Sequence, residues 1–370
     1  LANLRLYQYS AVDKSPLSYY VLRPYWNWCV QWFPMTMAPN LITLIGFCAV
    51  LIDVLLILIY TPDLATPAPA WVYVAFAAGL WIYSTFDNVD GKQARRTGTS
   101  SPLGELFDHG CDALNATAGG LVQAAGLGLG VSGRTCIVLF VTIGTFYIAS
   151  WENYHTKTLY LGYINGPTEG LVVSCLTMLA SAVWGPAIWH QPASHWIGPL
   201  APRTWLVCDL CTAGLLGLML TTQLPASLLN TTTMGQALWQ TIPFALFFLA
   251  VGVWLAAPGS VVMTPDYFIL FAFTVGLVFG RIATIIILAH VTHMPYPEWS
   301  LLYFPVYAGA LLSLPAVITG SPHAALWTPA GEATYLSIVF LWSLVAYLSW
   351  AWIVIQQFCH HLGIECLSIA

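Results

Sequence analysis

The sequence predicts an all-α integral membrane protein, with about ten transmembrane helices and an N-terminal helix in the membrane interface. Hydrophobic residues make up 58% of the chain and charged residues only 7%, whereas a soluble domain carries roughly 25% charged residues. The apolar runs are long and continuous. A transmembrane helix needs roughly 20 such residues, while the strands of a transmembrane barrel alternate over shorter segments.

Residues 1–39 contain no apolar run of this length. The stretch 18–33 is rich in Tyr and Trp and contains Arg23, which suits a helix lying in the plane of the membrane surface. The first residues also lack the basic and apolar regions of a signal peptide. We therefore expect residues 1–39 to form an N-terminal interfacial segment.

Ten apolar runs follow, and the sixth has the weakest edges. The first six, within residues 40–222, are expected to form one helical unit, and the last four, within residues 223–370, a second unit. The expected spans are 40–60, 70–90, 103–129, 135–154, 166–185, 205–222, 237–257, 267–290, 301–319 and 333–358.

The positions of Lys and Arg predict which side faces the cytosol. With an even number of spans, both ends of the chain share one side. That side collects Arg5, Lys14, Arg23, Lys92, Arg95, Arg96 and Lys157, while the other receives only Arg134 and Arg203. Both ends are therefore expected to be cytosolic. The glycosylation sequon at Asn230 falls on the same side and is expected to stay unmodified.

Charge is concentrated in residues 86–112, which hold eight of the 25 charged residues (10 basic and 15 acidic). Residues three and four apart share one face of a helix. At this spacing the end of the second span presents Asp87, Asp90, Gly91, Ala94 and Arg95, and the start of the third presents Glu105, Asp108, His109 and Asp112.

These two acidic faces are expected to meet, because consecutive helices joined by a short turn such as 96–102 become antiparallel neighbours. Four close carboxylates cannot all stay ionised without cations between them. Oxygen ligands favour Mg²⁺, Mn²⁺ or Ca²⁺, and two such ions roughly 3.5–4 Å apart suit in-line displacement at phosphorus. Arg95 is placed to pair with phosphate, and Gly91, Ala94 and Gly104 leave room for a ligand.

The pattern Asp87-x2-Asp90-Gly91-x2-Ala94-Arg95-x8-Gly104-x3-Asp108-x3-Asp112 resembles the signature of the CDP-alcohol phosphotransferase family at every fixed position. Outside the signature, the chain resembles the eukaryotic choline/ethanolamine phosphotransferases within that family. The stretches that carry this likeness are YQYSAVDKSPLSYYVLRPYWNW, APNLIT, GKQARRT, SPLGELFDHGCD, ENYHTKTLYLGYINGPTEG and FCHHLGIEC. The likeness covers nearly the whole chain and is weakest in 186–265.

The resemblance implies a reaction and a set of roles. The hydroxyl of diacylglycerol would attack the β-phosphate of CDP-choline or CDP-ethanolamine, releasing CMP and making phosphatidylcholine or phosphatidylethanolamine. Two Mg²⁺ or Mn²⁺ ions would be bound by Asp87, Asp90, Asp108 and Asp112. The donor would be contacted by Asn40, Gly91, Ala94, Arg95 and Gly104.

The resemblance also sets expectations for the whole molecule. Residues 40–222 would be the catalytic core, and residues 223–370 would supply dimer contacts and lipid access. A homodimer in the membrane of the endoplasmic reticulum or Golgi is implied, with the active site facing the cytosol. Membrane lipid is an expected partner, and nucleic acid is not.

The acceptor hydroxyl needs a base, and two candidates stay open. Asp112 is the aspartate often given this role in the wider family. His109 follows Glu105 by one helical turn, and an imidazole oriented by a carboxylate is better matched to neutral pH.

Polar and aromatic residues near the expected site are candidates for a donor or lipid pocket. Aromatic faces bind quaternary ammonium groups, so Tyr83, Trp81 and Tyr154 are candidates for the head group, although interfacial anchoring explains them as well. The further candidates are Glu152, His155, Asn165 and Glu169. Arg281, followed by His290 and His293, is either structural or lines an acceptor cavity, because charge inside a span is costly in lipid.

Two other functions fit parts of the pattern. Another branch of the family takes CDP-diacylglycerol and makes phosphatidylinositol, phosphatidylglycerol phosphate or phosphatidylserine, but its members tend to be shorter. A cation transporter could use the acids as an ion site. Such sites tend to lie near the bilayer midplane in repeated halves, whereas these acids lie at helix ends and no second half repeats them.

Overall fold

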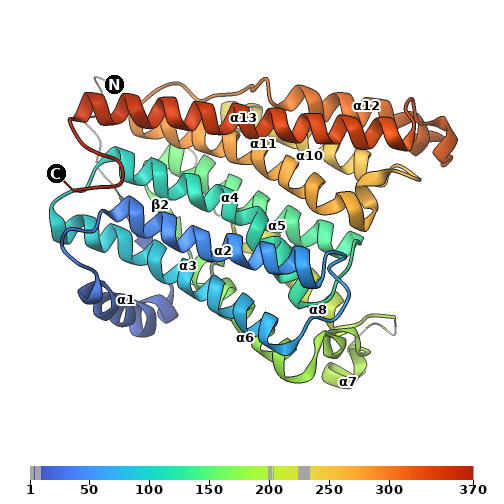
Figure 1. Ribbon diagram of the computed structural model, residues 1–370, viewed down its shortest axis with the longest axis horizontal. Helices are drawn as coiled ribbons and strands as arrows, with labels where there is room; N and C mark the ends of the chain where they lie inside the picture. Colours follow the sequence, from blue (N-terminus) through green and yellow to red (C-terminus); the bar gives the residue numbers. More distant parts are fainter. Residues whose placement is uncertain (1–3, 5–9, 199–201, 203, 224–233, 370) are drawn as a thin grey trace.

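The computed structural model describes residues 4, 10–198, 202, 204–223 and 234–369. Most of these residues are helical, and the long helices run side by side in one bundle (Figure 1). Each of the ten expected spans overlaps a helix. The long helices are α2 (Pro39–Tyr60), α3 (Ala70–Thr97), α4 (Pro102–Gly126), α5 (Gly133–Thr156), α6 (Leu171–Trp184), α8 (Val207–Leu218), α10 (Met234–Ala256), α11 (Pro265–Thr292), α12 (Tyr303–Thr319) and α13 (Pro329–Leu362).

Six helices in the described part of the chain are long and apolar enough to cross a membrane. They are α2, α5, the helix Gly166–Trp184 that ends in α6, the α10 segment Leu238–Ala256, α11 and α13. Two shorter apolar helices cover Val207–Thr221 and Tyr303–Thr319. Helices α3 and α4 are also long enough to cross a membrane, but they are not among these six. Their facing ends carry the charged stretch 86–112. The chain is therefore a mainly helical membrane protein.

A short β-sheet was not expected from the sequence. Strands β1 (Ala11–Asp13) and β2 (Leu159–Leu161) pair in parallel, with Ala11 opposite Leu159. Strands of three residues are too short to show the period-two pattern that identifies strands in a sequence. The N-terminal segment is thus attached to the helical bundle as well as lying at its surface.

The helix predicted in the interface is present as α1 (Arg23–Cys29), preceded by a helical turn over Ser18–Leu22. Its region exposes four large aromatic side chains, Tyr19, Tyr20, Trp28 and Trp32. Amphipathic rings of this kind concentrate at membrane–water boundaries. These side chains support the predicted position of the segment.

The C-terminal helices share a core with the first unit. Helix α11 packs against α4, α5 and α13, and one apolar cluster combines Tyr147 and Trp151 of α5 with residues of α10, α11 and α12. Gly276 permits the approach of α11 to α4, because a Cβ atom there would overlap Thr117. The expected boundary at residues 222/223 therefore does not interrupt the packing.

The turn between α3 and α4 forms as the sequence predicts. Gly98 ends α3 with a φ of 71°, a left-handed conformation that glycine adopts without a steric penalty. The Gly104 N–H donates to the Ser101 hydroxyl at 3.2 Å, and Pro102 occupies the first helical turn. Both features are typical of helix starts. The turn directs the charged ends of α3 and α4 toward each other.

Candidate active site

A cavity of about 890 Å³ lies where α3 ends and α4 begins. It is lined by every residue that the sequence predicted for metal binding or base catalysis, and by the five residues predicted to surround the nucleotide of the donor. These are Asn40, Asp87, Asp90, Gly91, Ala94, Arg95, Gly104, Glu105, Asp108, His109 and Asp112. Three helices contribute them, because α2 packs against both α3 and α4. The predicted assembly of two helix faces into one site is therefore present in the structure.

Two of the aspartates are held in place by hydrogen-bond donors. The Thr43 hydroxyl on α2 and the Gly91 N–H both donate to the Asp90 carboxylate. The Tyr83 hydroxyl donates to Asp112. These donors therefore fix the orientation of the Asp90 and Asp112 carboxylates.

The other two aspartates keep oxygen atoms available. Asp87 lies beside Asp108 and Asp112, close enough to interact with both. Atoms Oδ1 of Asp87 and Oδ1 of Asp108 are buried and accept no hydrogen bond from the described residues. Buried polar atoms normally have a partner. A divalent cation between the two helices would satisfy both atoms.

The donor set fits a hard metal ion. Ligand atoms of Asp108, His109 and Asp112 lie within 4.8 Å of one another. Carboxylate oxygens dominate the set, and Mg²⁺ and Mn²⁺ prefer such ligands. His109 belongs to this group too, so the structure places it beside the metal ligands as well as in reach of a substrate.

The imidazole of His109 is oriented by a main-chain group. Its Nδ1 lies 3.1 Å from the carbonyl oxygen of Glu105. Because a carbonyl oxygen only accepts, Nδ1 carries the proton in this bond and Nε2 keeps the basic lone pair. Asp108 Oδ2 lies 3.5 Å from the same Nδ1.

The contact between Glu105 and His109 differs from the expected one. The sequence suggested that the Glu105 carboxylate orients the His109 ring. That carboxylate instead lies 3.7 Å from Nε2 of His290 on α11. Glu105 and His290 are both buried, because α11 packs closely along α4. The main-chain carbonyl of Glu105 takes the orienting role that was expected of its side chain.

Arg95 is the residue that the sequence predicted for phosphate binding. It lines the cavity, its side chain is exposed, and it forms none of the ion pairs found among the described residues. A guanidinium group of this kind is suited to bidentate binding of phosphate.

The six residues proposed for a donor or lipid pocket are not among the described residues that line the cavity. The Tyr83 hydroxyl donates to Asp112. The Tyr154 hydroxyl donates to the Met294 carbonyl at 2.8 Å. His155 Nε2 lies 2.8 Å from Gln240 Oε1. Glu152 is buried.

Of the remaining two, Asn165 caps the helical turn that begins at Gly166, and Glu169 contacts the N-terminal segment. Asn165 Oδ1 accepts from the Thr168 N–H at 3.0 Å, and Glu169 Oε2 accepts from the Asn165 N–H at 3.0 Å. The Ser15 hydroxyl donates to Glu169 Oε1. Asn165 and Glu169 thus have structural contacts. Their sequence neighbours Pro167 and Thr168 line the cavity.

Three other residues singled out in the sequence have structural surroundings. The Trp81 Nε1–H donates to the Tyr25 hydroxyl at 3.0 Å, which agrees with anchoring of α1. The Arg281 guanidinium stacks 3.5 Å from the centre of the Trp350 ring on α13. His293 ends α11 in a left-handed conformation. Asn230 lies outside the described residues.

Sequence reasoning missed several lining residues. Asn88, Ser150 and Asn153 line the cavity, and so does the segment after α13. Ser150 and Asn153 are polar residues three apart in an apolar span, a spacing that predicts one face. This spacing could therefore have predicted that Ser150 and Asn153 line the site. The segment after α13 carries no such pattern.

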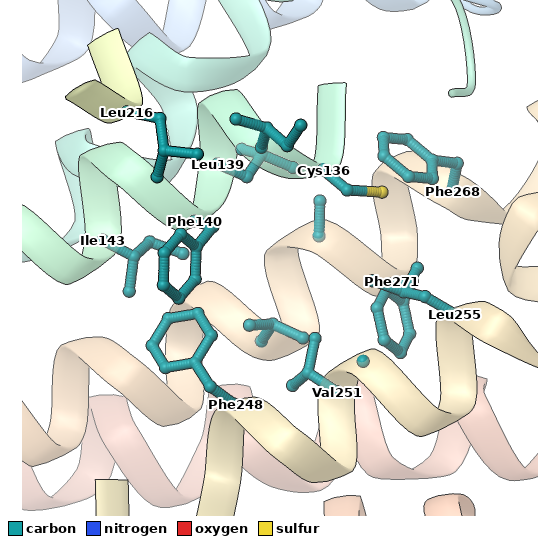
Figure 2. A pocket seen from close by; sticks show the side chains of 14 residues that line it. Cys136, Leu139, Phe140, Ile143, Leu216, Phe248, Val251, Leu255, Phe268 and Phe271 are labelled. Carbon is teal, nitrogen blue, oxygen red and sulfur yellow. The ribbon is translucent and has the colours of Figure 1, made fainter. Parts of the chain in front are cut away.

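A second cavity of about 290 Å³ lies between α5, α8, α10 and α11 (Figure 2). Its lining is apolar and includes Leu139, Leu216 and Phe271. The rings of Phe140 and Phe248 meet there edge to face, with centroids 4.9 Å apart. Helices α5 and α11 line both cavities. A hydrocarbon chain fits this environment, and a polar group does not.

The fold and the site define a helical membrane protein with a carboxylate site suited to a divalent metal and a phosphate ligand. Comparison with known sequences identifies the protein family. The chain belongs to the CDP-alcohol phosphatidyltransferase family, whose sequence model matches residues 36–201.

Three relatives are matched over most of their length. Choline/ethanolaminephosphotransferase 1 of Arabidopsis thaliana is 37% identical, over 100% of this chain and 97% of the relative. Ethanolaminephosphotransferase 1 of Mus musculus is 31% identical, over 100% of this chain and 93% of the relative. Cholinephosphotransferase 1 of Saccharomyces cerevisiae is 35% identical, over 80% of this chain and 79% of the relative.

Proposed function

We propose that the protein transfers phosphocholine or phosphoethanolamine from its CDP ester to the hydroxyl of diacylglycerol. One observation supports this most: the eleven predicted metal, base and donor residues line a single cavity. The names of the full-length relatives supply the choline and ethanolamine donors. Their different head groups at similar identity favour a site that accepts both.

The metal ligands of this proposal are Asp87, Asp90, Asp108 and Asp112. We propose that the set binds two Mg²⁺ or Mn²⁺ ions. When bound, such ions would neutralise charge on the pyrophosphate and on departing CMP. Asn40, Gly91, Ala94, Arg95 and Gly104 would surround the donor, with Arg95 pairing with phosphate.

The reaction then needs one proton acceptor near the hydroxyl of diacylglycerol. Oxygen of that hydroxyl forms a bond to the β-phosphorus, the bond from this phosphorus to the CMP oxygen breaks, and the proton goes to the base. Nε2 of His109 is the proposed base, because Nδ1 is committed to the Glu105 carbonyl. Asp112 is the less favoured candidate, since the Tyr83 hydroxyl already donates to it.

The apolar cavity in Figure 2 is proposed to take part of an acyl chain. Ser150 and Asn153 line the polar cavity, while Cys136 and Ile143 line the apolar one on the same helix. Phe146 also lines the polar cavity, so at 1.5 Å per residue the three residues from Ile143 to Phe146 separate the two linings by about 4.5 Å along α5. A fatty acyl chain is long enough to bridge this distance.

The proposal includes the membrane arrangement. The six apolar helices, together with α3, α4, α8 and α12, would make ten spans, with the carboxylate site on the cytosolic side of the endoplasmic reticulum or Golgi membrane. Basic residues Arg23, Lys92 and Arg95 line the cavity end of the bundle, which supports this orientation. A homodimer through the C-terminal helices stays a prediction.

The activity is tested by measuring CMP release from labelled CDP-choline and CDP-ethanolamine, with diacylglycerol and Mg²⁺. Asp90→Asn should abolish release. Asp209→Asn is the matched control, because Asp209 pairs with Arg134 at 2.6 Å and does not line the cavity. Absence of metal-dependent CMP release with either donor from the unsubstituted protein would refute the proposal.

The base is tested separately by His109→Ala. Loss of general-base catalysis should lower kcat by about 10²-fold or more, while the affinity for CDP-choline is retained. Unchanged turnover would return the role to Asp112.

A further inference from the structure

The segment after α13, residues 363–369, turns back over the active-site cavity. Gly363 ends α13 with a φ of 66°, and the Ile364 N–H donates to the Cys359 carbonyl at 3.1 Å. In Figure 1 the red trace descends from α13 toward the ends of α4 and α2. Five residues beyond Gly363 line the cavity: Ile364, Glu365, Cys366, Ser368 and Ile369.

One hydrogen bond connects this segment to the donor-binding residues. The Nδ2 group of Asn40 donates to the main-chain carbonyl of Cys366 at 3.0 Å. Because the carbonyl only accepts, the bond fixes which way the Asn40 amide points. Atom Oδ1 is then directed toward Gly104, where an added Cβ would lie 3.7 Å away. The segment thus presents the Asn40 acceptor to the donor side of the cavity.

Apolar packing holds the segment in place, but only on one side. Ile364 and Cys366 pack against an apolar cluster that includes Leu103 and Leu106 of α4. Glu365 and the residues that follow Cys366 are largely exposed. An extended chain points successive side chains to opposite faces. A segment with one packed face and one hydrogen bond can leave the cavity at modest cost.

Leucines 103 and 106 precede the metal ligand Asp108 on the same helix. The segment therefore packs against the first turns of the helix that carries Asp108, and it reaches across to Asn40 on α2. It spans the entrance between the two helices that would face the nucleotide.

We propose that residues 363–369 form a movable wall of the donor pocket, which positions Asn40 when the CDP-alcohol is bound. This rests on the proposed function, because it takes the cavity to be the donor site. The segment is a positioning element: no side chain in it takes part in the chemical step. It should affect the KM for the donor and leave kcat nearly unchanged.

The kinetic test weakens the packing of residues 363–369 and keeps the segment in the chain. Ile364→Ser combined with Ile369→Ser removes apolar side chains that line the cavity, and Leu367→Ser is the matched control because Leu367 is 43% exposed. Loss of one positioned hydrogen bond predicts a rise in the KM for CDP-choline of roughly threefold to tenfold. The kcat should stay within about twofold, and the control should match the unsubstituted enzyme.

A direct readout uses the thiol of Cys366. CDP-choline with Mg²⁺, without diacylglycerol, should slow maleimide modification of Cys366 in the unsubstituted enzyme, as mapped by mass spectrometry. Cys359 on α13, which does not line the cavity, is the internal reference. In the double variant the protection should be lost, even at a donor concentration that saturates turnover.

Each outcome separates the two proposals. CMP release with an unchanged KM in the double variant, or protection of Cys366 that the double variant retains, would overturn the inference alone. A loss confined to kcat would overturn it as well. No CMP release by the unsubstituted enzyme would overturn the proposed function and this inference with it.

Discussion

Thr43 is expected to control metal affinity although it lies outside the cavity lining. Its hydroxyl donates to Asp90, and its side chain is only 2% exposed. Thr43→Val keeps the shape but removes the donor. A hydrogen bond to a charged group contributes about 1.5–3 kcal/mol, which corresponds to roughly 10–100-fold in binding. Loss of a residue that orients a metal ligand typically costs the same factor, about 10–100-fold.

The assay is a Mg²⁺ titration of CMP release at saturating CDP-choline and diacylglycerol. In Thr43→Val, the Mg²⁺ concentration for half-maximal activity should rise roughly 10–100-fold, with the maximal rate nearly restored at high Mg²⁺. Thr85→Val is the control. Its hydroxyl donates to the Trp81 carbonyl at 2.8 Å and faces Tyr25, so its Mg²⁺ dependence should be normal. Identical titrations for the two variants would refute the assignment of Asp90 as a metal ligand.

Two further predictions follow. Removal of divalent metal with EDTA should abolish CMP release, and Mg²⁺ or Mn²⁺ should restore it, because the site offers mainly carboxylate oxygens; activity that survives complete metal removal would contradict this. Gly309→Ala should lower the free energy of unfolding by about 1–3 kcal/mol, because the added Cβ would overlap the buried Trp254 ring. Gly217→Ala is the control. A Cβ added at Gly217 has no atom within 4 Å, so this variant should unfold at the same temperature as the unsubstituted protein.

The clustering of the four aspartates could be predicted because its information is local. Asp87 and Asp90 share a face of α3, Asp108 and Asp112 share a face of α4, and the short turn between them leaves few ways for the helices to meet. Helical spacing and the turn chemistry at Ser101 and Pro102 therefore determined the arrangement before any tertiary contact was known.

The contacts that the sequence did not reveal join residues far apart in the chain. Strands β1 and β2 are separated by more than 140 residues, and Asn40 and Cys366 by 326. Periodicity carries no information about such pairs. The Glu105 carboxylate illustrates the same limit: its position depends on α11, which brings His290 to within 3.7 Å.

The two pairs of aspartates differ in a way that gives the metal a structural role. Asp90 and Asp112 are each fixed by a hydroxyl donor. Asp87 on α3 and Asp108 on α4 each have a buried oxygen without a protein donor among the described residues. Those two oxygens come from different helices, and bringing them together without a cation is electrostatically unfavourable. A bound ion would therefore join α3 to α4 and hold the donor-binding face of α2 against both, so that donor affinity and metal affinity should rise and fall together.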